Sequence, residues 1–169
     1  CHKVVKSGIN AVILLFNMIF RGLNKINLDA KGRIAIPVRY KDSLSNLSSN
    51  ILICTIDQDH CLLLYPLKFW KSIEKKIMAL PTLNSTSRRL QRLMVGHAAE
   101  IEIDSNGRIL IPKELREFAK LTKQAMLVGQ GNKFEIWNYN DWNTGREKWL
   151  STKEADLSEL PPEFGTLSL

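Results

Sequence analysis

The chain has 169 residues, a formal net charge of +7 and a sequence pI near 9.4. With 44% hydrophobic and 24% charged residues, its composition excludes the disordered and fibrous classes, and its length fits one compact domain or two small ones. The basic balance favours a polyanionic partner, with nucleic acid ahead of an anionic membrane surface.

Residues 1–17 combine Lys3 and Lys6 with a short apolar run, which loosely resembles a secretion signal. The run is too short to span a bilayer, no cleavage site of small residues follows it, and Met18 offers a natural start. We therefore expect residues 1–17 to be a non-native or over-extended segment, and we expect no membrane contact. Without them the charge is still +5, since two lysines and no acids are removed.

An internal repeat organises the remaining chain. Segment 26–37, INLDAKGRIAIP, recurs as segment 101–112, IEIDSNGRILIP, with seven of twelve positions identical at an offset of 75 residues. Further on, LLLY at 62–65 corresponds to FEIW at 134–137, at an offset of 72. One copy is too small to bury much core alone, so we expect the two copies to interleave their hairpins around one shared core.

The sequence pattern of each copy predicts the same helices and strands in the same order. Alternating apolar residues predict two short strands, separated by a turn that reads Asp-x-x-Gly-Arg. In the first copy Pro37 is expected at the first position of a short helix that carries Tyr40 and Leu44 on one face. A pair of strands follows, at 51–56 and 61–65 in the first copy and at 126–130 and 134–137 in the second.

Two helical segments connect the copies. The first carries apolar residues at helical spacing, namely Trp70, Ile73, Ile77 and Leu80. The second follows Pro81 and is expected to be capped by Asn84 or Ser85. The expected division is a first repeat at 18–83, a linking basic helix at 84–97, a second repeat at 98–145 and a loosely held tail at 146–169. The expected fold is α+β, one pseudo-symmetric domain in which the hairpins of two tandem repeats interleave.

The repeated turn is the candidate functional site. A strand-turn-strand ribbon is narrow enough to enter a DNA major groove. Arg33 is expected to point away from the face that holds Ile34 and Ile36, where its guanidinium can donate two hydrogen bonds to guanine O6 and N7. Arg108 occupies the same place in the second copy.

The acidic and glycine positions of the turns are expected to support them. Asp29 and Asp104 are poor DNA contacts because phosphates repel them, so their expected role is to fix the turn or to orient the arginine. Gly32 and Gly107 supply a positive φ without steric cost. The alternative is a hairpin with no DNA role, in which each arginine pairs only with its own aspartate.

Charge placement distinguishes the two copies. Six basic and two acidic residues lie between Met18 and Asp42, whereas the region from Ala98 to Lys123 has five of each. We therefore expect the first copy to be the stronger DNA contact. The DNA-binding candidates are Arg33, Lys31, Arg39, Arg21, Lys25 and Arg108.

A second basic group, formed by Arg88, Arg89 and Arg92, lies on the linking helix. Its spacing places these side chains on one helix face. They are candidates for phosphate contacts or for pairing with acids of a neighbouring subunit.

The order of motifs resembles the MraZ family from Met18 to Leu169. The motifs are Phe20-Arg21-Gly22, Asp29-x-Lys31-Gly32-Arg33-x-x-x-Pro37, Arg89-x-x-Arg92-x-x-x-Gly96-x-Ala98 and Leu127-Val128-Gly129 with Phe134-Glu135-x-Trp137. The resemblance implies that the two tandem repeats are AbrB-like and form a double swapped-hairpin barrel with flanking helices. It further implies a ring of identical subunits in the cytoplasm, associated with the nucleoid. It also implies binding to short direct DNA repeats, G-rich on one strand, upstream of the division and cell-wall gene cluster. The family's DNA-contacting arginine corresponds to Arg33, with Arg108 as its counterpart in the second copy.

Three other functions compete with this one. The three cysteines and three histidines lack zinc-site spacing, and no phosphate loop or nucleophile motif occurs, so we expect no catalysis, no metal and no cofactor. An AbrB-like antitoxin, which binds DNA and a toxin partner, usually carries one hairpin copy and a separate tail. A pure assembly protein predicts no salt-dependent DNA binding.

Overall fold

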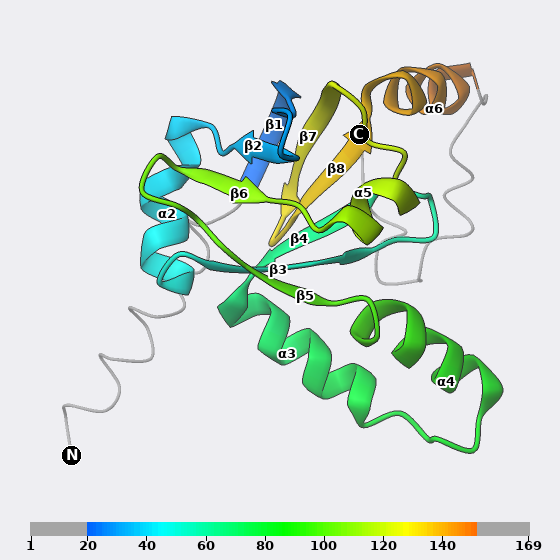
Figure 1. Cartoon of the computed structure of the whole chain (residues 1–169). Helices are drawn as coiled ribbons and strands as arrows, with labels where there is room; N and C mark the ends of the chain where they lie inside the picture. The colour runs from blue at the N-terminus through cyan, green and yellow to red at the C-terminus, as the bar shows by residue number, and fades with distance from the viewer. Residues whose placement is uncertain (1–19, 152–169) are drawn as a thin grey trace, which may run out of the picture. The chain divides into compact units, whose positions relative to one another are not determined.

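The computed structural model describes residues 20–151 (Figure 1). The chain divides into two compact units between Tyr139 and Asn140, and the first of these units holds the strands of both repeats. The expectations for residues 1–17 and for the tail beyond residue 151 lie outside the described residues. The other boundaries, expected at residues 83, 97 and 145, stay predictions.

The two repeats contain the same succession of elements. The first has β1 (Phe20–Asn27), β2 (Arg33–Ala35), α2 (Val38–Ser48), β3 (Ile51–Ile56), β4 (Leu62–Pro66) and α3 (Leu67–Met78). The second has β5 (Ala99–Glu102), β6 (Arg108–Leu110), α5 (Lys113–Phe118), β7 (Gln124–Gly131), β8 (Phe134–Asn138) and α6 (Tyr139–Ser151). Between them, α4 (Ser85–Leu90) continues into η1 (Gln91–Val95), a single π-helical turn. In the range from residue 20 to residue 151, none of the helices has the length and apolar character that a bilayer span requires.

The repeats exchange strands with one another. Within residues 20–151, the larger sheet has the order β1-β7-β8-β4-β3-β5, and β2 pairs with β6 in a separate two-stranded ribbon. β1 of the first repeat lies against β7 of the second, and β5 of the second lies against β3 of the first. The strands on either side of each turn therefore pair with strands of the other repeat, and the prediction of interleaved hairpins around one core is confirmed.

The register of the strands reveals an approximate twofold relation between the repeats. Ile34 lies directly opposite Ile109, and these residues correspond at the repeat offset of 75. Leu63 lies opposite Glu135, and these correspond at the second offset of 72. A residue can face its own counterpart only where a twofold axis passes between the two strands, so the axis crosses both the ribbon and the centre of the sheet.

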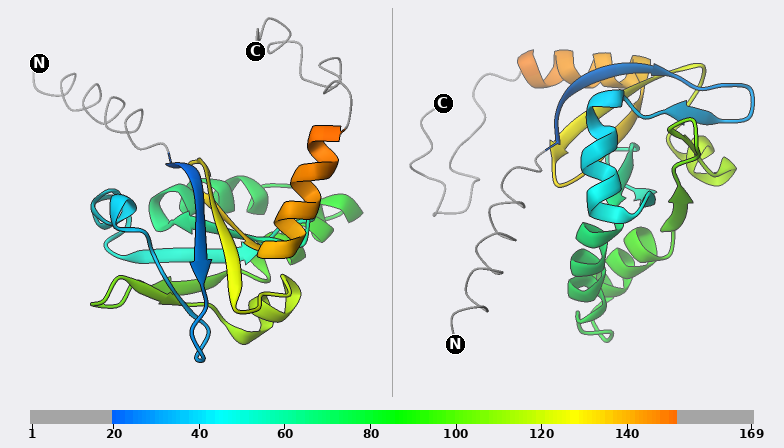
Figure 2. Two further views of the ribbon diagram at one scale, coloured as in Figure 1. Left: turned by 90° about the horizontal axis from the view of Figure 1, so that it is seen from above. Right: turned by 90° about the vertical axis from the view of Figure 1, so that its left-hand side faces the viewer.

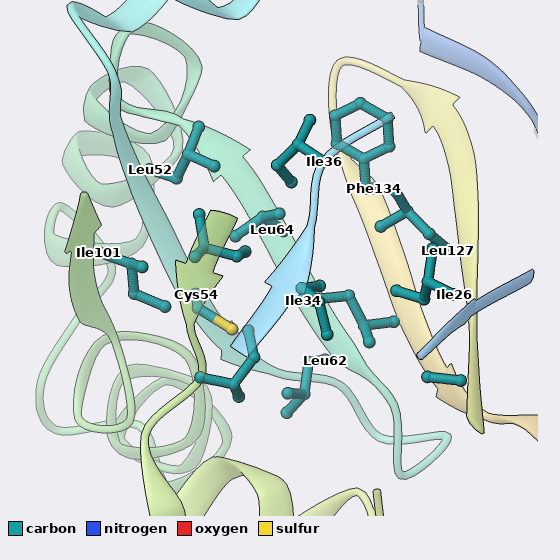
Figure 3. Packing of buried hydrophobic residues seen from close by; sticks show 14 of the residues in the cluster. Ile26, Ile34, Ile36, Leu52, Cys54, Leu62, Leu64, Ile101, Leu127 and Phe134 are labelled. Atoms are coloured by element: carbon teal, nitrogen blue, oxygen red, sulfur yellow. The ribbon is translucent and has the colours of Figure 1, made fainter. Parts of the chain in front are cut away.

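The core lies between the ribbon and the larger sheet. Four isoleucines of the ribbon segments, Ile34, Ile36, Ile109 and Ile111, are at most 2% exposed. Figure 3 shows the first two among side chains of the large sheet, including Cys54, Leu62, Leu64, Leu127 and Phe134. Complete burial of one such side chain contributes roughly 1.5–3 kcal/mol. Apolar residues therefore alternate along the ribbon strands because every second side chain packs into this core.

Most helix signals in the sequence are confirmed, with two corrections. The Asn84 side chain accepts hydrogen bonds from the backbone N–H groups of Thr86 and Ser87, so it caps α4 as predicted. The start of α2 was predicted one residue too early, because the ψ of Pro37 is 137°, which is extended, and the helix begins at Val38. Likewise Leu80 lies beyond the end of α3, which stops at Met78.

Candidate nucleic-acid interface

The first turn is closed by the side chain and backbone of Asp29. Its Oδ1 accepts hydrogen bonds from the backbone N–H groups of Lys31 and Arg33, both at 2.9 Å. The N–H of Gly32 donates to the Asp29 carbonyl oxygen at 3.0 Å, and Gly32 has a φ of +84°. A residue with a side chain is strained at this φ, so the turn requires the glycine.

The second turn has the same construction. Oδ1 of Asp104 accepts from the N–H groups of Asn106 and Arg108 at 2.9 Å, and Gly107 has a φ of +73°. The two turns thus differ in their side chains rather than in their backbone.

Both arginines are bonded to the aspartate of their own turn. Arg33 Nε donates to Asp29 Oδ2 at 2.7 Å. Arg108 uses two nitrogens on Asp104 Oδ2, Nε at 3.0 Å and Nη2 at 2.9 Å. Within residues 20–151 the side-chain hydrogen bonds of both arginines run through Nε alone, and Nη2 of Arg108 additionally lies within ion-pair distance of Asp104. Pairing with the aspartate therefore leaves Nη1 and Nη2 of Arg33, the two terminal nitrogens of the guanidinium, without a hydrogen bond inside the described residues.

The turn environment stabilises both carboxylates in their charged form. The backbone N–H of Arg33, assisted by its side chain, lowers the pKa of Asp29 from 3.8 to about 2. The backbone N–H of Arg108 similarly lowers the pKa of Asp104. Both aspartates are thus ionised at neutral pH and hold the arginines by charge-assisted hydrogen bonds.

The contribution of Asp29 to folding stability is expected to disappear only in strong acid. Because its pKa falls from 3.8 to about 2 on folding, the contribution is complete above pH 3.8 and is lost as the pH falls through 2. Urea unfolding of the wild type and of Asp29→Asn, at about pH 5 and about pH 2.5, measures this effect. The difference in free energy of unfolding between the two proteins should shrink at the lower pH, and a constant difference would contradict the prediction.

The ribbon presents the two arginines on its outer face. Ile34 and Ile109 point into the core, so their strand neighbours point outward. Arg33 lies opposite Leu110, which is 51% exposed, and Arg108 is two residues from Leu110 on the same strand and the same face. The arginines are thus diagonal neighbours, with backbones roughly 7–8 Å apart. The predicted orientation of Arg33, away from the face of Ile34, is confirmed.

Other predicted DNA contacts lie at different distances from the first turn. Lys31 is exposed on the turn itself. Arg21 and Lys25 are exposed on β1, and Lys25 Nζ lies 4.2 Å from the centre of the Tyr139 ring. From Arg21 the extended chain covers roughly 25 Å before it reaches Asp29. The roles of Arg21 and Lys25 in DNA binding stay predictions.

Arg39 is held against β1 instead of against the turn. Its Nη2 donates to Asn24 Oδ1 at 2.8 Å and to the Tyr40 hydroxyl at 2.7 Å. The hydroxyl in turn donates to the carbonyl oxygen of Arg21 at 2.7 Å. Arg39 thus takes part in fastening α2 to β1, and a phosphate contact by its remaining nitrogens stays a prediction.

In the basic group of the linking helix, Arg88 bonds within the chain, whereas Arg89 and Arg92 are exposed. Arg88 Nη1 donates to the carbonyl oxygens of Thr82 and Leu83, both at 2.8 Å, and so fastens the loop before α4. Whether the three side chains contact phosphate or another subunit stays a prediction.

The fold brings to the turns two basic residues that the sequence pattern did not indicate. A side chain at Gly32 would collide with the Arg116 guanidinium of α5, and one at Gly107 would collide with Lys41 of α2. Each turn is therefore covered by a helix of the other repeat. Residues 41 and 116 correspond at the offset of 75. This correspondence, together with the expected interleaving of the repeats, could have placed both residues beside the turns from the sequence alone.

Comparison with known proteins agrees with the repeat. The family model described as "MraZ protein, putative antitoxin-like" matches residues 19–93 and again residues 94–159. A protein of Coxiella burnetii (strain Dugway 5J108-111), named Transcriptional regulator MraZ, is 52% identical over 151 residues, which cover 89% of this chain and 99% of the relative. Proteins with the same name and coverage are 49% identical in Halorhodospira halophila and 47% identical in Legionella pneumophila (strain Corby). Since the family model accounts for both repeats and these relatives match over nearly their whole length, the chain belongs to the MraZ family.

Proposed function

We propose that this chain is a transcriptional regulator that binds double-stranded DNA through the outer face of the β2–β6 ribbon and reads guanine with Arg33. Three observations support the proposal: the relatives are named transcriptional regulators, the chain carries a net charge of +7, and the ribbon exposes both repeat arginines. A two-stranded ribbon fits the width of the major groove of B-DNA.

The bonding of Arg33 is the observation that carries the proposal. Asp29 holds Nε at 2.7 Å, so the guanidinium is oriented, and within residues 20–151 Nη1 and Nη2 donate no hydrogen bond. These two nitrogens form the end of the guanidinium fork and can donate parallel hydrogen bonds to O6 and N7 of one guanine. Arg108 approaches Asp104 with Nη2 as well, and its turn carries Asn106 in place of Lys31. The first turn is therefore the proposed reader, and the second supports fold and position.

We further propose that several subunits act together on one operator. One ribbon contacts only a few base pairs, so its affinity alone is low. A ring of identical subunits, spaced to match short G-rich direct repeats, increases the affinity through effective concentration. The proposed operator lies upstream of the chain's own gene, in the division and cell-wall cluster, and the proposed effect is repression at the nucleoid in the cytoplasm.

Fluorescence anisotropy with two labelled duplexes tests this function. One duplex carries the DNA immediately upstream of the chain's own gene, and the other is a shuffled duplex of equal length and composition. We expect tighter binding to the upstream duplex, with log K falling linearly as log salt rises. An upstream duplex trimmed to a single G-rich repeat should bind about 10²-fold more weakly or worse. Equal binding to the upstream and shuffled duplexes would exclude sequence reading.

A further inference from the structure

We propose that α5 and the loop after it, although they belong to the second repeat, bind the DNA phosphates beside the first turn. The surface concerned, called the α5 groove below, consists of Lys113, Arg116, Glu117, Lys120, Leu121, Thr122 and Lys123. This inference rests on the proposed DNA-binding function and adds the backbone contact that accompanies base reading by Arg33.

The strand exchange brings the α5 groove to the first turn. The groove continues onto Leu28, Asp29 and Ala30, and the Arg116 guanidinium lies against the α-carbon of Gly32. The N–H of Leu28 donates to the carbonyl oxygen of Lys123 at 2.9 Å, which fixes the end of the groove to the start of the turn. Both views of Figure 2 show the loop between β1 and β2 protruding beside α5.

The charge of this groove differs from that of its counterpart at the second turn. Four basic and two acidic residues line the α5 groove and the adjoining turn. The counterpart, between α2 and the second turn, is lined by one basic residue, Lys41, and two acidic ones, Asp42 and Asp104. Of the lysines that make the difference, Lys113 and Lys120 stand at the offset of 75 from Val38 and Ser45. Lys123, whose carbonyl oxygen accepts from the N–H of Leu28, takes the structural place of Asn50, whose carbonyl oxygen accepts from the N–H of Ile103. An anion is thus attracted to the first turn and not to the second.

The cations of the α5 groove are weakly engaged within the protein. In the described range, no hydrogen bond or ion pair holds the Arg116 guanidinium, and its Nε is buried without a partner. Lys113 approaches Glu117 at 3.7 Å, but both side chains are largely exposed, so this pair contributes little. The terminal nitrogens of Arg116, on a half-buried side chain, are therefore free to donate charge-assisted hydrogen bonds to an approaching phosphate oxygen.

A ribbon in the major groove has a phosphate backbone along each side. Cations that flank the reading residue therefore meet phosphates when the ribbon enters the groove, and such contacts fix register without carrying sequence information. Each neutralised phosphate steepens the dependence of binding on salt by about 0.9 in log–log slope. The proposed division of labour is base reading by Arg33 and phosphate binding by the α5 groove.

The test measures the salt slope of the full chain on the upstream and shuffled duplexes. Arg116→Gln removes one cation, and a triple variant replaces the groove lysines at 113, 120 and 123 by glutamine. Lys41→Gln is the matched control, because it removes the corresponding cation at the second turn. Arg116→Lys restores the charge. Thermal unfolding confirms that each variant folds. If Arg116→Gln does not fold, the triple lysine variant still tests the inference, because those lysines are exposed.

We expect Arg116→Gln to lower the slope by about 0.9 and to weaken both duplexes by the same factor, which leaves their affinity ratio unchanged. The triple variant should lower the salt slope by about 1 to 3. Arg116→Lys should restore the wild-type slope, and Lys41→Gln should leave the slope unchanged. Wild-type slopes for both groove variants, or an equal loss for Lys41→Gln, would overturn the inference while the base-reading function stands. Absence of selective, salt-dependent binding by the wild type would overturn both.

Discussion

Replacing Ile34 by alanine is expected to lower the free energy of unfolding of the chain by about 2–5 kcal/mol. Ile34 is 1% exposed and lies at the centre of β2, directly opposite Ile109, where the approximate twofold axis crosses the ribbon. Removing its outer carbons leaves a cavity among side chains of both repeats (Figure 3), and the surrounding strands relax only in part. Urea unfolding of wild type and variant measures the loss.

The interleaved fold makes a stricter prediction about the same variant. Because the core is shared, the loss should appear at one common midpoint for probes in each repeat. Trp70 of α3 and Trp137 of β8 are suitable fluorescence probes when each is kept as the only tryptophan. Ile109→Ala should cost a similar amount, and the double variant should depart from additivity because the side chains are direct partners. Val38→Ala, at a side chain 78% exposed, is the control and should change little. Separate midpoints for the two probes would contradict the shared core.

Arg33→Ala is expected to weaken binding to the upstream duplex by about 1–3 kcal/mol, which is about 5- to 150-fold in Kd. The reason is the loss of both terminal nitrogens that Asp29 leaves available for a guanine. The same variant should bind the shuffled duplex nearly as well as the wild type, apart from the loss of one charge. Anisotropy titrations on both duplexes measure the two effects separately.

Arg108→Ala is the matched control for that prediction. It removes the same residue type from the same turn structure, but from a turn that carries Asn106 in place of Lys31 and whose arginine approaches Asp104 with Nη2 as well. We expect a smaller loss of affinity and a largely retained preference for the upstream duplex. The folding stability of both variants should remain close to that of wild type, since partly exposed ion pairs contribute about 0–1 kcal/mol. An equal loss for both variants would show that the turns contribute equally.

Local structure was predictable because its causes are local. Alternation of apolar residues predicted the strands, the Asp and Gly positions predicted the turns, and Asn84 predicted a helix start. The interleaving followed from the small size of each copy, which leaves one repeat without a core of its own. The one-residue error at Pro37 arose because its fixed φ suits a helix start, while ψ, which the residue type does not fix, remained extended.

The surroundings of the first turn were not predictable from charge counts along the chain. Such counts assume that sequence neighbours are spatial neighbours, and the strand exchange places Arg116 and Lys123 of the second repeat beside the first turn. The balanced charge of the second repeat thus concealed a basic groove. Conversely, Arg39 and Arg88 count as free cations in the sequence, but each bonds to its own chain.

The central claim, that Arg33 reads a guanine through Nη1 and Nη2, is tested most directly by combining a protein change with a base change. Replacing guanines of the upstream duplex one at a time by 7-deazaguanine removes the N7 acceptor and leaves base pairing intact. We predict that one such replacement weakens wild-type binding and has no further effect on Arg33→Ala, so the two losses are not additive. Arg108→Ala should still respond to the replacement as wild type does. Additive losses at every guanine would contradict the claim.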